Sequence, residues 1–272
     1  MYTINDDATL LINIDKALTE SSKESLILAL NHYINVLVNE LGENLVSVIL
    51  HGSLCAGDFD IKTSDIDLIV TTQTELSLND FYVMSHIHNA LKVHAPEWGK
   101  RFEISYITHD ELYTLAPPVH PRIYLNGGHT KQETYGAEWY FEKNTICISG
   151  LSIYGQPLIR EKLSVTSTKL RIAAFQILME WWKPIVNRGM HHLSDVYLTY
   201  AVLSMCRIIM TIEKGINGTK FEAAQSVLDN KLTGYEDLIQ HVIDFKSVDE
   251  EYKSKAIDFI KETVDTYLRD YL

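Results

Sequence analysis

The first half of the chain alternates between segments with helical hydrophobic spacing and segments typical of strands. Residues 22–41 and 79–95 carry apolar side chains at helical spacing. Three β-rich segments lie between or after them: LVSVILHG (45–52), SDIDLIVTT (64–72) and RFEISYITH (101–109). This order of helices and strands predicts a mixed α/β unit.

The pattern changes further along the chain. Residues 110–135 hold three of the six prolines and the turn signal Asn126-Gly127-Gly128, so we expect a long loop there. From about residue 158 onward the periodicity becomes helical. The pattern therefore predicts an α+β protein with two domains, a sheet-containing domain over residues 1–157 and an all-helical domain over residues 158–272.

Composition narrows the class of protein. Lys and Arg number 24 against 36 Asp and Glu, a formal net charge of −12. This balance argues against a nucleic-acid partner, which needs clustered Lys and Arg, and suits cationic or neutral small partners. No apolar run approaches the roughly 20 residues that span a bilayer. The polar, acidic N-terminus and the absence of a C-x-x-C pair complete the prediction of a cytoplasmic protein without membrane contact.

Two carboxylates carry the strongest chemical signal. Asp65 and Asp67 lie two residues apart on a predicted strand, so both project from the same face. Carboxylates about 7 Å apart along one face repel each other unless a cation lies between them. Mg²⁺ prefers oxygen ligands, with substrate phosphates completing its shell. The spacing therefore predicts a magnesium site at these two aspartates.

Other polar residues accompany this pair. Gly52 and Ser53 follow an apolar strand, where a turn can offer N–H groups and a hydroxyl to phosphate oxygens. Glu103 lies between apolar strand residues, where it either faces solvent or joins the site. Two histidine pairs lack a third ligand at convincing spacing and are interpreted as ordinary surface residues: His86 with His88, and His191 with His192.

The string G-S-x-x-x-G, followed by S-D-x-D-L-x-V, resembles the signature of the DNA-polymerase-β-like nucleotidyltransferase superfamily. Four segments are similar to the aminoglycoside adenylyltransferases that modify streptomycin (3'') and spectinomycin (9): YGAEW (135–139), IYGQP (153–157), YAVLSMCR (200–207) and GTKFEAA (218–224). The loop between Ser53 and Asp65 is slightly longer than in that pattern. The resemblance implies a polymerase-β-like domain with a mixed sheet, a helical C-terminal domain, and an active site between them.

The resemblance also implies roles for residues of the first domain. Asp65 and Asp67 would hold Mg²⁺ on the nucleotide phosphates. Ser53, with Gly52, would contact the triphosphate. Glu103 would be the catalytic base, which fits the chemistry because an alcohol is a poor nucleophile at neutral pH until a base takes its proton.

For the later residues, each implied role has a structural alternative. Lys220 would reach the ATP phosphates, or is a surface lysine at a helix start. Trp139 would pack against the antibiotic, or lies in the core. Asp195 would hold a cationic group of the antibiotic, or caps a helix at a position for which Ser194 competes. Lys246 stands where family members can carry an aromatic residue that contacts the nucleotide.

The function predicted from these residues is an ATP-dependent adenylyltransferase. It would transfer AMP to a hydroxyl of a cationic small-molecule antibiotic, streptomycin or spectinomycin, and release pyrophosphate. Two alternatives stay open. One is a nucleotidyltransferase for another acceptor, a lincosamide or a protein side chain of a toxin–antitoxin pair. The other is a non-catalytic nucleotide-binding protein. The sequence makes no prediction of the oligomeric state.

Overall fold

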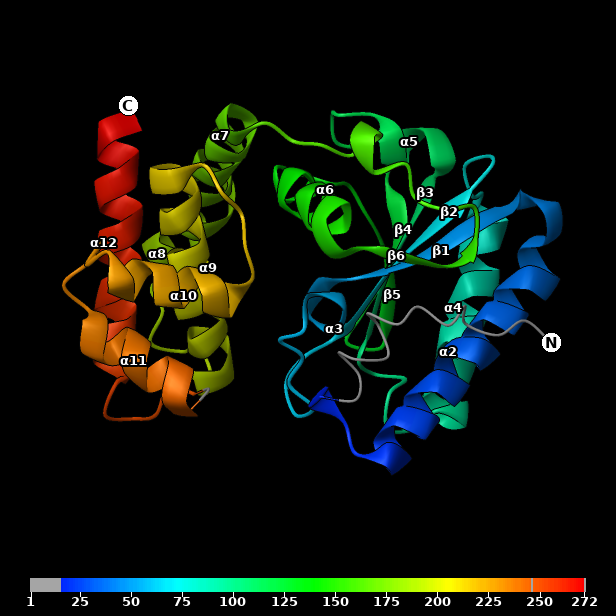
Figure 1. Cartoon of the computed structure of the whole chain (residues 1–272), viewed down its shortest axis with the longest axis horizontal. Helices are drawn as coiled ribbons and strands as arrows, with labels where there is room; N and C mark the ends of the chain where they lie inside the picture. The colour runs from blue at the N-terminus through cyan, green and yellow to red at the C-terminus, as the bar shows by residue number, and fades with distance from the viewer. Residues whose placement is uncertain (1–15, 246, 272) are drawn as a thin grey trace. The chain divides into compact units, whose positions relative to one another are not determined.

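A computed structural model describes residues 16–245 and 247–271 of the chain. The described residues divide into two compact units (Figure 1). The first unit comprises residues 16–135 and 142–164, and the second comprises residues 136–141, 165–245 and 247–271. Residues 158–164, expected in the helical domain, thus pack with the first unit, and residues 136–141 pack with the second.

The first unit is built on one mixed sheet. Its strand order is β5-β4-β3-β2-β1-β6. Strands β2 and β3 are parallel, and every other neighbouring pair is antiparallel. This arrangement confirms the predicted α+β fold class. The strands are β1 (Leu45–His51), β2 (Ile66–Thr72), β3 (Phe102–Thr108), β4 (Arg122–Asn126), β5 (His129–Glu133) and β6 (Leu151–Gly155).

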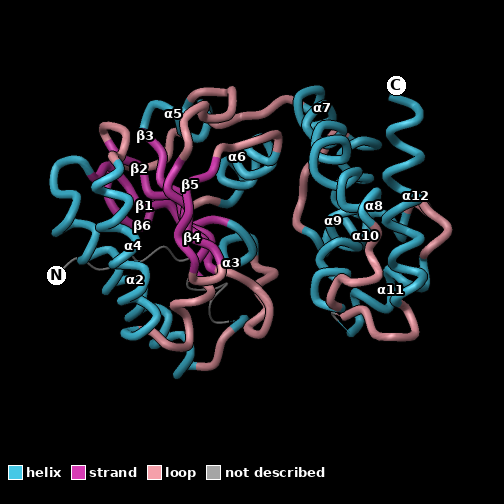
Figure 2. The backbone as a smooth tube through the Cα atoms, turned by 180° about the vertical axis from the view of Figure 1, so that it is seen from behind, coloured by secondary structure: helices cyan, strands magenta, loops and turns pink. Residues whose placement is uncertain are grey.

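Two long helices lie side by side against this sheet, α2 (Glu20–Leu41) and α4 (Leu78–His94) (Figures 1 and 2). Leu50 of β1 and Leu68 of β2 are register partners, so both point to the same face of the sheet. They belong to one buried cluster with Leu30 of α2. Shorter helical segments complete the unit: η1 (Gly42–Asn44), α3 (Gly52–Ala56), α5 (His109–Tyr113), α6 (Glu138–Ser149, which starts in the second unit) and η2 (Arg160–Lys162).

The prediction of a long loop over residues 110–135 is wrong in part, because this segment contains a hairpin. Strands β4 and β5 pair from Arg122↔Glu133 to Asn126↔His129. The turn between them consists of Gly127 and Gly128, with φ of 56° and 77°. Glycine tolerates positive φ at both positions of such a two-residue turn. The polar sequence of β5, HTKQE, hid the strand because it lacks an apolar face.

The second unit contains only helices and loops among its described residues (Figure 2). Its central helix is α9 (Asp195–Lys214), where Leu198, Val202 and Met205 are buried. Packed with it are α7 (Ser167–Ile177), the π-helical segment η3 (Leu178–Trp182), α8 (Lys183–Arg188), α10 (Lys220–Asp229), α11 (Glu236–Phe245) and α12 (Lys253–Tyr271).

Helix α9 corrects the expectation that no segment is apolar enough to span a bilayer. Among the described helices it alone meets that criterion by length and composition, with a mean hydropathy of 1.4 over 18 residues. Of that window, 56% is buried within the protein. A core helix of a helical domain gives the same signal, and the buried face of α9 identifies it as one.

Candidate active site

Parallel pairing of β2 and β3 places two of the predicted carboxylates next to each other. Asp67 of β2 is the register partner of Glu103 of β3. Asp65 lies just before β2, two residues from Asp67. Asp67 and Glu103 are half-buried, and Asp65 is exposed. Paired residues of parallel strands point to the same face of the sheet, so the sequence prediction that Glu103 joins the aspartates agrees with the strand register.

Gly52 lies in close contact with the Asp67 carboxylate. A Cβ atom built on Gly52 would stand 1.8 Å from Oδ2 of Asp67, far inside van der Waals contact, and the glycine has φ of +70°. Only glycine therefore fits this place. The next residue, Ser53, belongs to the five-residue helix α3, which ends at Gly57 in the left-handed conformation. The glycine–serine turn thus stands directly beside one predicted magnesium ligand.

Two residues of β4 hold Glu103, and the sequence analysis did not identify them. The Tyr124 hydroxyl donates to Oε1 of Glu103. The Asn126 side-chain amide donates to Oε2 at 3.0 Å. Burial, followed by the charge of Glu103, raises the pKa of Tyr124 well above its usual range, so the phenol remains a donor. The alternation Tyr124-x-Asn126 would have indicated this role had β4 been recognised as the neighbour of β3.

A second polar cluster, also missed by the sequence analysis, lies at the end of β1. His51 is the register partner of Asp67, and burial lowers its pKa to about 4. The imidazole is therefore neutral at neutral pH, and its 3.8 Å approach to the Glu142 carboxylate is not an ion pair there. Glu142 in turn accepts a hydrogen bond of 2.9 Å from the Tyr135 hydroxyl. The charge of Glu142 also contributes to raising the pKa of Tyr124, which places it near the Glu103 contacts.

The donor chemistry fits Mg²⁺ bound with a substrate. Among the described residues, no group of three His, Cys, Asp or Glu side chains comes close enough to hold a metal by itself. Asp65 and Asp67 supply hard carboxylate oxygens. Magnesium often binds to one or two carboxylates together with substrate phosphates. The absence of a Cβ on Gly52 leaves the Asp67 oxygen room that any other residue would fill.

Of the two histidine pairs, His88 is not a surface residue. It is fully buried, with Nδ1 2.8 Å from the Thr130 hydroxyl and Nε2 2.8 Å from that of Tyr106. Burial lowers its pKa to about 3. Both ring nitrogens form hydrogen bonds with hydroxyl groups, so this histidine is a structural residue in the core of the first unit.

In the second unit, two predicted site residues begin helices. Lys220 is the first residue of α10, whose N-cap is Thr219, and its Nζ lies 4.5 Å from the centroid of the Tyr200 ring. Asp195 is the first residue of α9, and the N-cap is Ser194, which settles that competition. The Asp195 carboxylate lies 3.3 Å from Nζ of Lys253.

The remaining predicted residues differ in accessibility. Trp139 is fully buried, so its contact with an antibiotic stays a prediction. It belongs to the segment 136–141, which is attached to the second unit by a hydrogen bond of 3.1 Å from the Asn217 amide to the Phe141 carbonyl. Lys246 lies outside the described residues.

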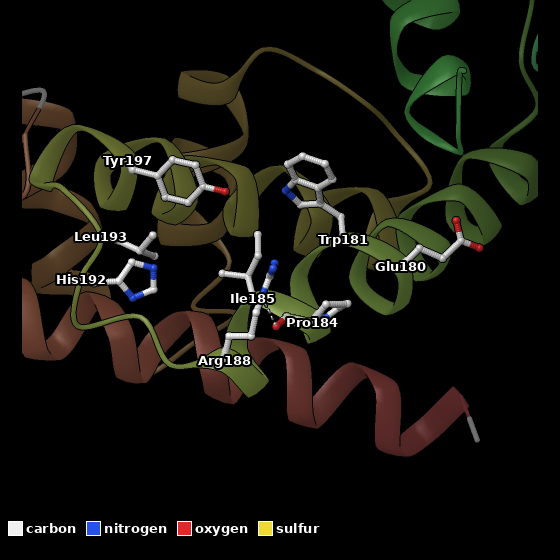
Figure 3. A pocket seen from close by; sticks show the side chains of 8 residues that line it. All are labelled: Glu180, Trp181, Pro184, Ile185, Arg188, His192, Leu193 and Tyr197. Atoms are coloured by element: carbon white, nitrogen blue, oxygen red, sulfur yellow. Dashed lines mark hydrogen bonds between the residues drawn. The ribbon is translucent and has the colours of Figure 1, made fainter. Parts of the chain in front are cut away.

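A pocket of about 570 Å³ lies on the second unit, where aromatic and aliphatic side chains surround it (Figure 3). Trp181, 54% exposed, comes from the π-helical segment and faces the pocket with Tyr197 of α9. The lining also includes one acidic residue, Glu180, and one basic residue, Arg188. The complete lining is Glu180, Trp181, Pro184, Ile185, Arg188, His192, Leu193 and Tyr197.

Comparison with known proteins supports the fold. No family model matches the sequence, and no curated protein matches it. Among solved structures, spectinomycin adenyltransferase AAD(9) from Enterococcus faecialis, with ATP and spectinomycin, superposes with a TM-score of 0.64 at 17% identity. The match covers 87% of this chain and 98% of that one. The chain therefore has the same overall fold as AAD(9), with a mixed six-stranded sheet followed by helices.

Proposed function

We propose that this protein is a Mg²⁺-dependent adenylyltransferase that transfers AMP from ATP to a hydroxyl group of a small antibiotic. Streptomycin and spectinomycin are the first candidate acceptors. The observation that carries the proposal is the registered pair of Asp67 and Glu103, with Gly52 against Asp67 and Asp65 two residues before it. AAD(9), which has the same fold, was solved with ATP and spectinomycin.

In this proposal Asp65 and Asp67 hold Mg²⁺ with the triphosphate, and Ser53 contacts a phosphate oxygen. Bound Mg²⁺ would stabilise negative charge on the transferring and leaving oxygens. Glu103 takes the proton from the acceptor hydroxyl as its oxygen bonds to the α-phosphorus and the bond to pyrophosphate breaks. A carboxylate has about four acceptor positions, so Glu103 can do this while Tyr124 and Asn126 hold it.

Lys220 would contribute to binding the nucleotide, and its place as the first residue of α10 supports that role. Its Nζ already stands over the Tyr200 ring, an arrangement that keeps the ammonium group close to one place. Removal of Lys220 therefore belongs among the variants that distinguish nucleotide binding from acceptor binding.

One observation favours a second candidate, an acceptor with less positive charge than an aminoglycoside. Asp195, the acid predicted to hold cationic groups, already pairs with Lys253. The pocket of the second unit is lined mainly by aromatic and aliphatic side chains, together with one acidic residue, Glu180, and one basic residue, Arg188. With one group of each sign, this lining offers a strongly cationic ligand little net attraction. Lincosamides and other weakly charged alcohols are therefore included as acceptors in the test.

The decisive measurement is pyrophosphate release from Mg²⁺-ATP with streptomycin, spectinomycin, kanamycin, lincomycin or no acceptor. We expect release with one acceptor and a loss of about 100-fold or more in Glu103→Gln, because a positioned base contributes roughly that much. The matched control is Glu133→Gln, which alters a partly exposed glutamate on β5 and should keep full activity. Nucleotide binding without release for any acceptor would instead support a non-catalytic nucleotide-binding protein.

A further inference from the structure

Arg101 makes an unusual set of contacts beside the candidate site. Its guanidinium group donates to three carbonyl oxygens of one loop. The Nε–H bonds Ser64 at 3.0 Å, and Nη1 bonds Ile61 at 2.7 Å. Nη2 bonds Asp60 at 3.3 Å and also bonds Ser64. These bonds fasten the loop 60–64, the segment that leads directly into Asp65.

The two aromatic neighbours of Arg101 fix the plane of its side chain. Its guanidinium carbon lies 5.3 Å from the centroid of the Phe59 ring and 5.0 Å from that of Trp98. Both rings are buried, Trp98 completely. Arginine stacks on aromatic faces while its planar fork of donors remains available, which lysine cannot imitate. The packing therefore orients the fork toward the loop.

The backbone of Arg101 is also tied to the strand of the carboxylates. Its carbonyl accepts a hydrogen bond of 2.8 Å from the Ile66 N–H, the residue that follows Asp65. Arg101 directly precedes β3 as Asp65 directly precedes β2, and the strands are in register from Ile66↔Phe102 onward. Arg101 thus stands beside Asp65 in the same way that Glu103 stands beside Asp67.

We propose that Arg101 is a positioning residue that fixes the loop 60–64 and thereby orients Asp65 relative to Asp67 for binding a divalent cation. This inference rests on the proposed function, because it concerns the cation site used there. The loop lies in the longer connection between Ser53 and Asp65, and a long connection has many conformations to restrict.

The charge of Arg101 and the geometry of its hydrogen bonds have opposite effects on cation binding. It interacts favourably with the carboxylates of Asp65, Glu97 and Asp60. A nearby positive charge repels a divalent cation, so removal of the charge alone would strengthen cation binding. Loss of the fork would weaken cation binding, because the ligand carboxylate would no longer be held. The two effects can therefore be separated by substitution.

The test compares Arg101→Lys and Arg101→Gln with Arg160→Lys as the matched control. Arg160 is also half-buried in the first unit and also donates to three carbonyl oxygens, those of Ile146, Cys147 and Gly150, away from the carboxylates. The dissociation constant for Mn²⁺ is measured by electron paramagnetic resonance, with Mn²⁺ alone and with α,β-methylene-ATP. Hydrogen exchange of the peptide containing residues 60–66 is measured in parallel.

We expect Arg101→Lys, which keeps the charge and loses the fork, to bind Mn²⁺ about tenfold more weakly, the usual effect of removing a group that orients a metal ligand. Arg101→Gln also loses the positive charge, so its loss of affinity should be smaller. Exchange over residues 60–66 should be faster in Arg101→Lys and unchanged in Arg160→Lys. Wild-type Mn²⁺ affinity in Arg101→Lys, or an equal loss in Arg160→Lys, would overturn the inference.

The design also separates this inference from the proposed function. If the wild-type chain bound no Mn²⁺ even with the nucleotide analogue, the proposed function would fail. Hydrogen exchange would then decide the role of Arg101 on its own. Faster exchange over residues 60–66 in Arg101→Lys alone would support the fastening of the loop, and unchanged exchange would refute it.

Discussion

The two units of this chain differ in what they bury. Among the described residues, eight buried polar side chains belong to the first unit and three to the second. The eight include two histidines, an arginine and a lysine, whereas the three are uncharged. Those of the first unit are Ser47, His51, Thr71, Thr72, His88, Ser105, Arg122 and Lys143, and those of the second are Thr211, Asn217 and Thr263.

This difference indicates that side-chain positions are fixed more tightly in the first unit. Buried polar groups must be hydrogen-bonded, so they restrict a core to one arrangement. In the first unit, strand register and side-chain donors place the candidate catalytic groups, as Tyr124 and Asn126 do for Glu103. In the second unit, Lys220 and Asp195 begin helices over a largely apolar core. Substitutions should therefore have larger effects in the first unit.

The largest effect is expected for Gly52→Ala. The new Cβ would collide with the Asp67 carboxylate at 1.8 Å, and alanine would also be strained at φ of +70°. Strain of this kind costs about 1–3 kcal/mol, and displacement of Asp67 adds the loss of a cation ligand. We expect transfer activity to fall by about 100-fold or more, measured as pyrophosphate release.

Gly127→Ala serves as the control for this substitution. Gly127 has φ of +56° but nothing within 4 Å of its Cβ position. It should lower stability by about 1–2 kcal/mol, measured by urea unfolding, and leave activity nearly unchanged. Equal losses of activity in the two variants would mean that backbone strain, rather than contact with Asp67, explains the effect.

An intermediate effect is expected on the stability of the first unit when the pH is lowered. Burial lowers the pKa of His51 from about 6.5 to about 4, so the unfolded state binds a proton more readily than the folded state. The contribution of neutral His51 to the free energy of unfolding is therefore present above pH 6.5 and is lost as the pH falls toward 4. We expect the free energy of unfolding to be about 2 kcal/mol lower at pH 5 than at pH 7 on account of His51.

Urea unfolding of His51→Gln at both pH values measures this contribution. The difference between pH 7 and pH 5 should shrink by that amount in the variant. His129→Gln, which removes an exposed histidine of β5, should leave the difference as it is in the wild type. An unchanged pH dependence in His51→Gln would contradict the burial argument.

The smallest effect is expected for Asp195→Asn in the second unit. The carboxylate is half exposed and already paired with Lys253, so it offers little net charge to a ligand. We expect the KM for a cationic acceptor to change by less than about threefold. A rise of tenfold or more would restore the sequence-based role of Asp195 and would reduce the contrast between the two units.

Much of the first unit could be predicted from the sequence because its signals are local. The alternation in IDLIV and FEISYIT indicates β2 and β3, and the spacing of Asp65 and Asp67 follows from the two-residue period of a strand. From the sequence, Glu103 could either face solvent or join the site. Its place beside Asp67 follows only from the pairing of β2 with β3, and that pairing depends on residues more than 30 positions apart.

The residues whose roles could not be predicted make contacts with partners that are distant in the sequence. Tyr124 and Arg101 are ordinary residues in their own segments, and their contacts to Glu103 and to the loop 60–64 arise only from the tertiary fold. Strand β5 escaped for a different reason. As an edge strand it is polar, and hydrophobic alternation cannot reveal it.

The parallel pairing of β2 and β3 has a consequence for how this gene can change. The two strands are joined by a crossover that contains α4, which contributes none of the candidate catalytic residues. Insertions in the part of this crossover that precedes α4 can therefore be tolerated without moving Asp67 or Glu103, whereas its other end carries Trp98 and Arg101. A single residue inserted within β3 ahead of Glu103 would turn its side chain to the opposite face of the sheet. Length variation among descendants of this gene should accordingly accumulate in the crossover and be absent from the two strands.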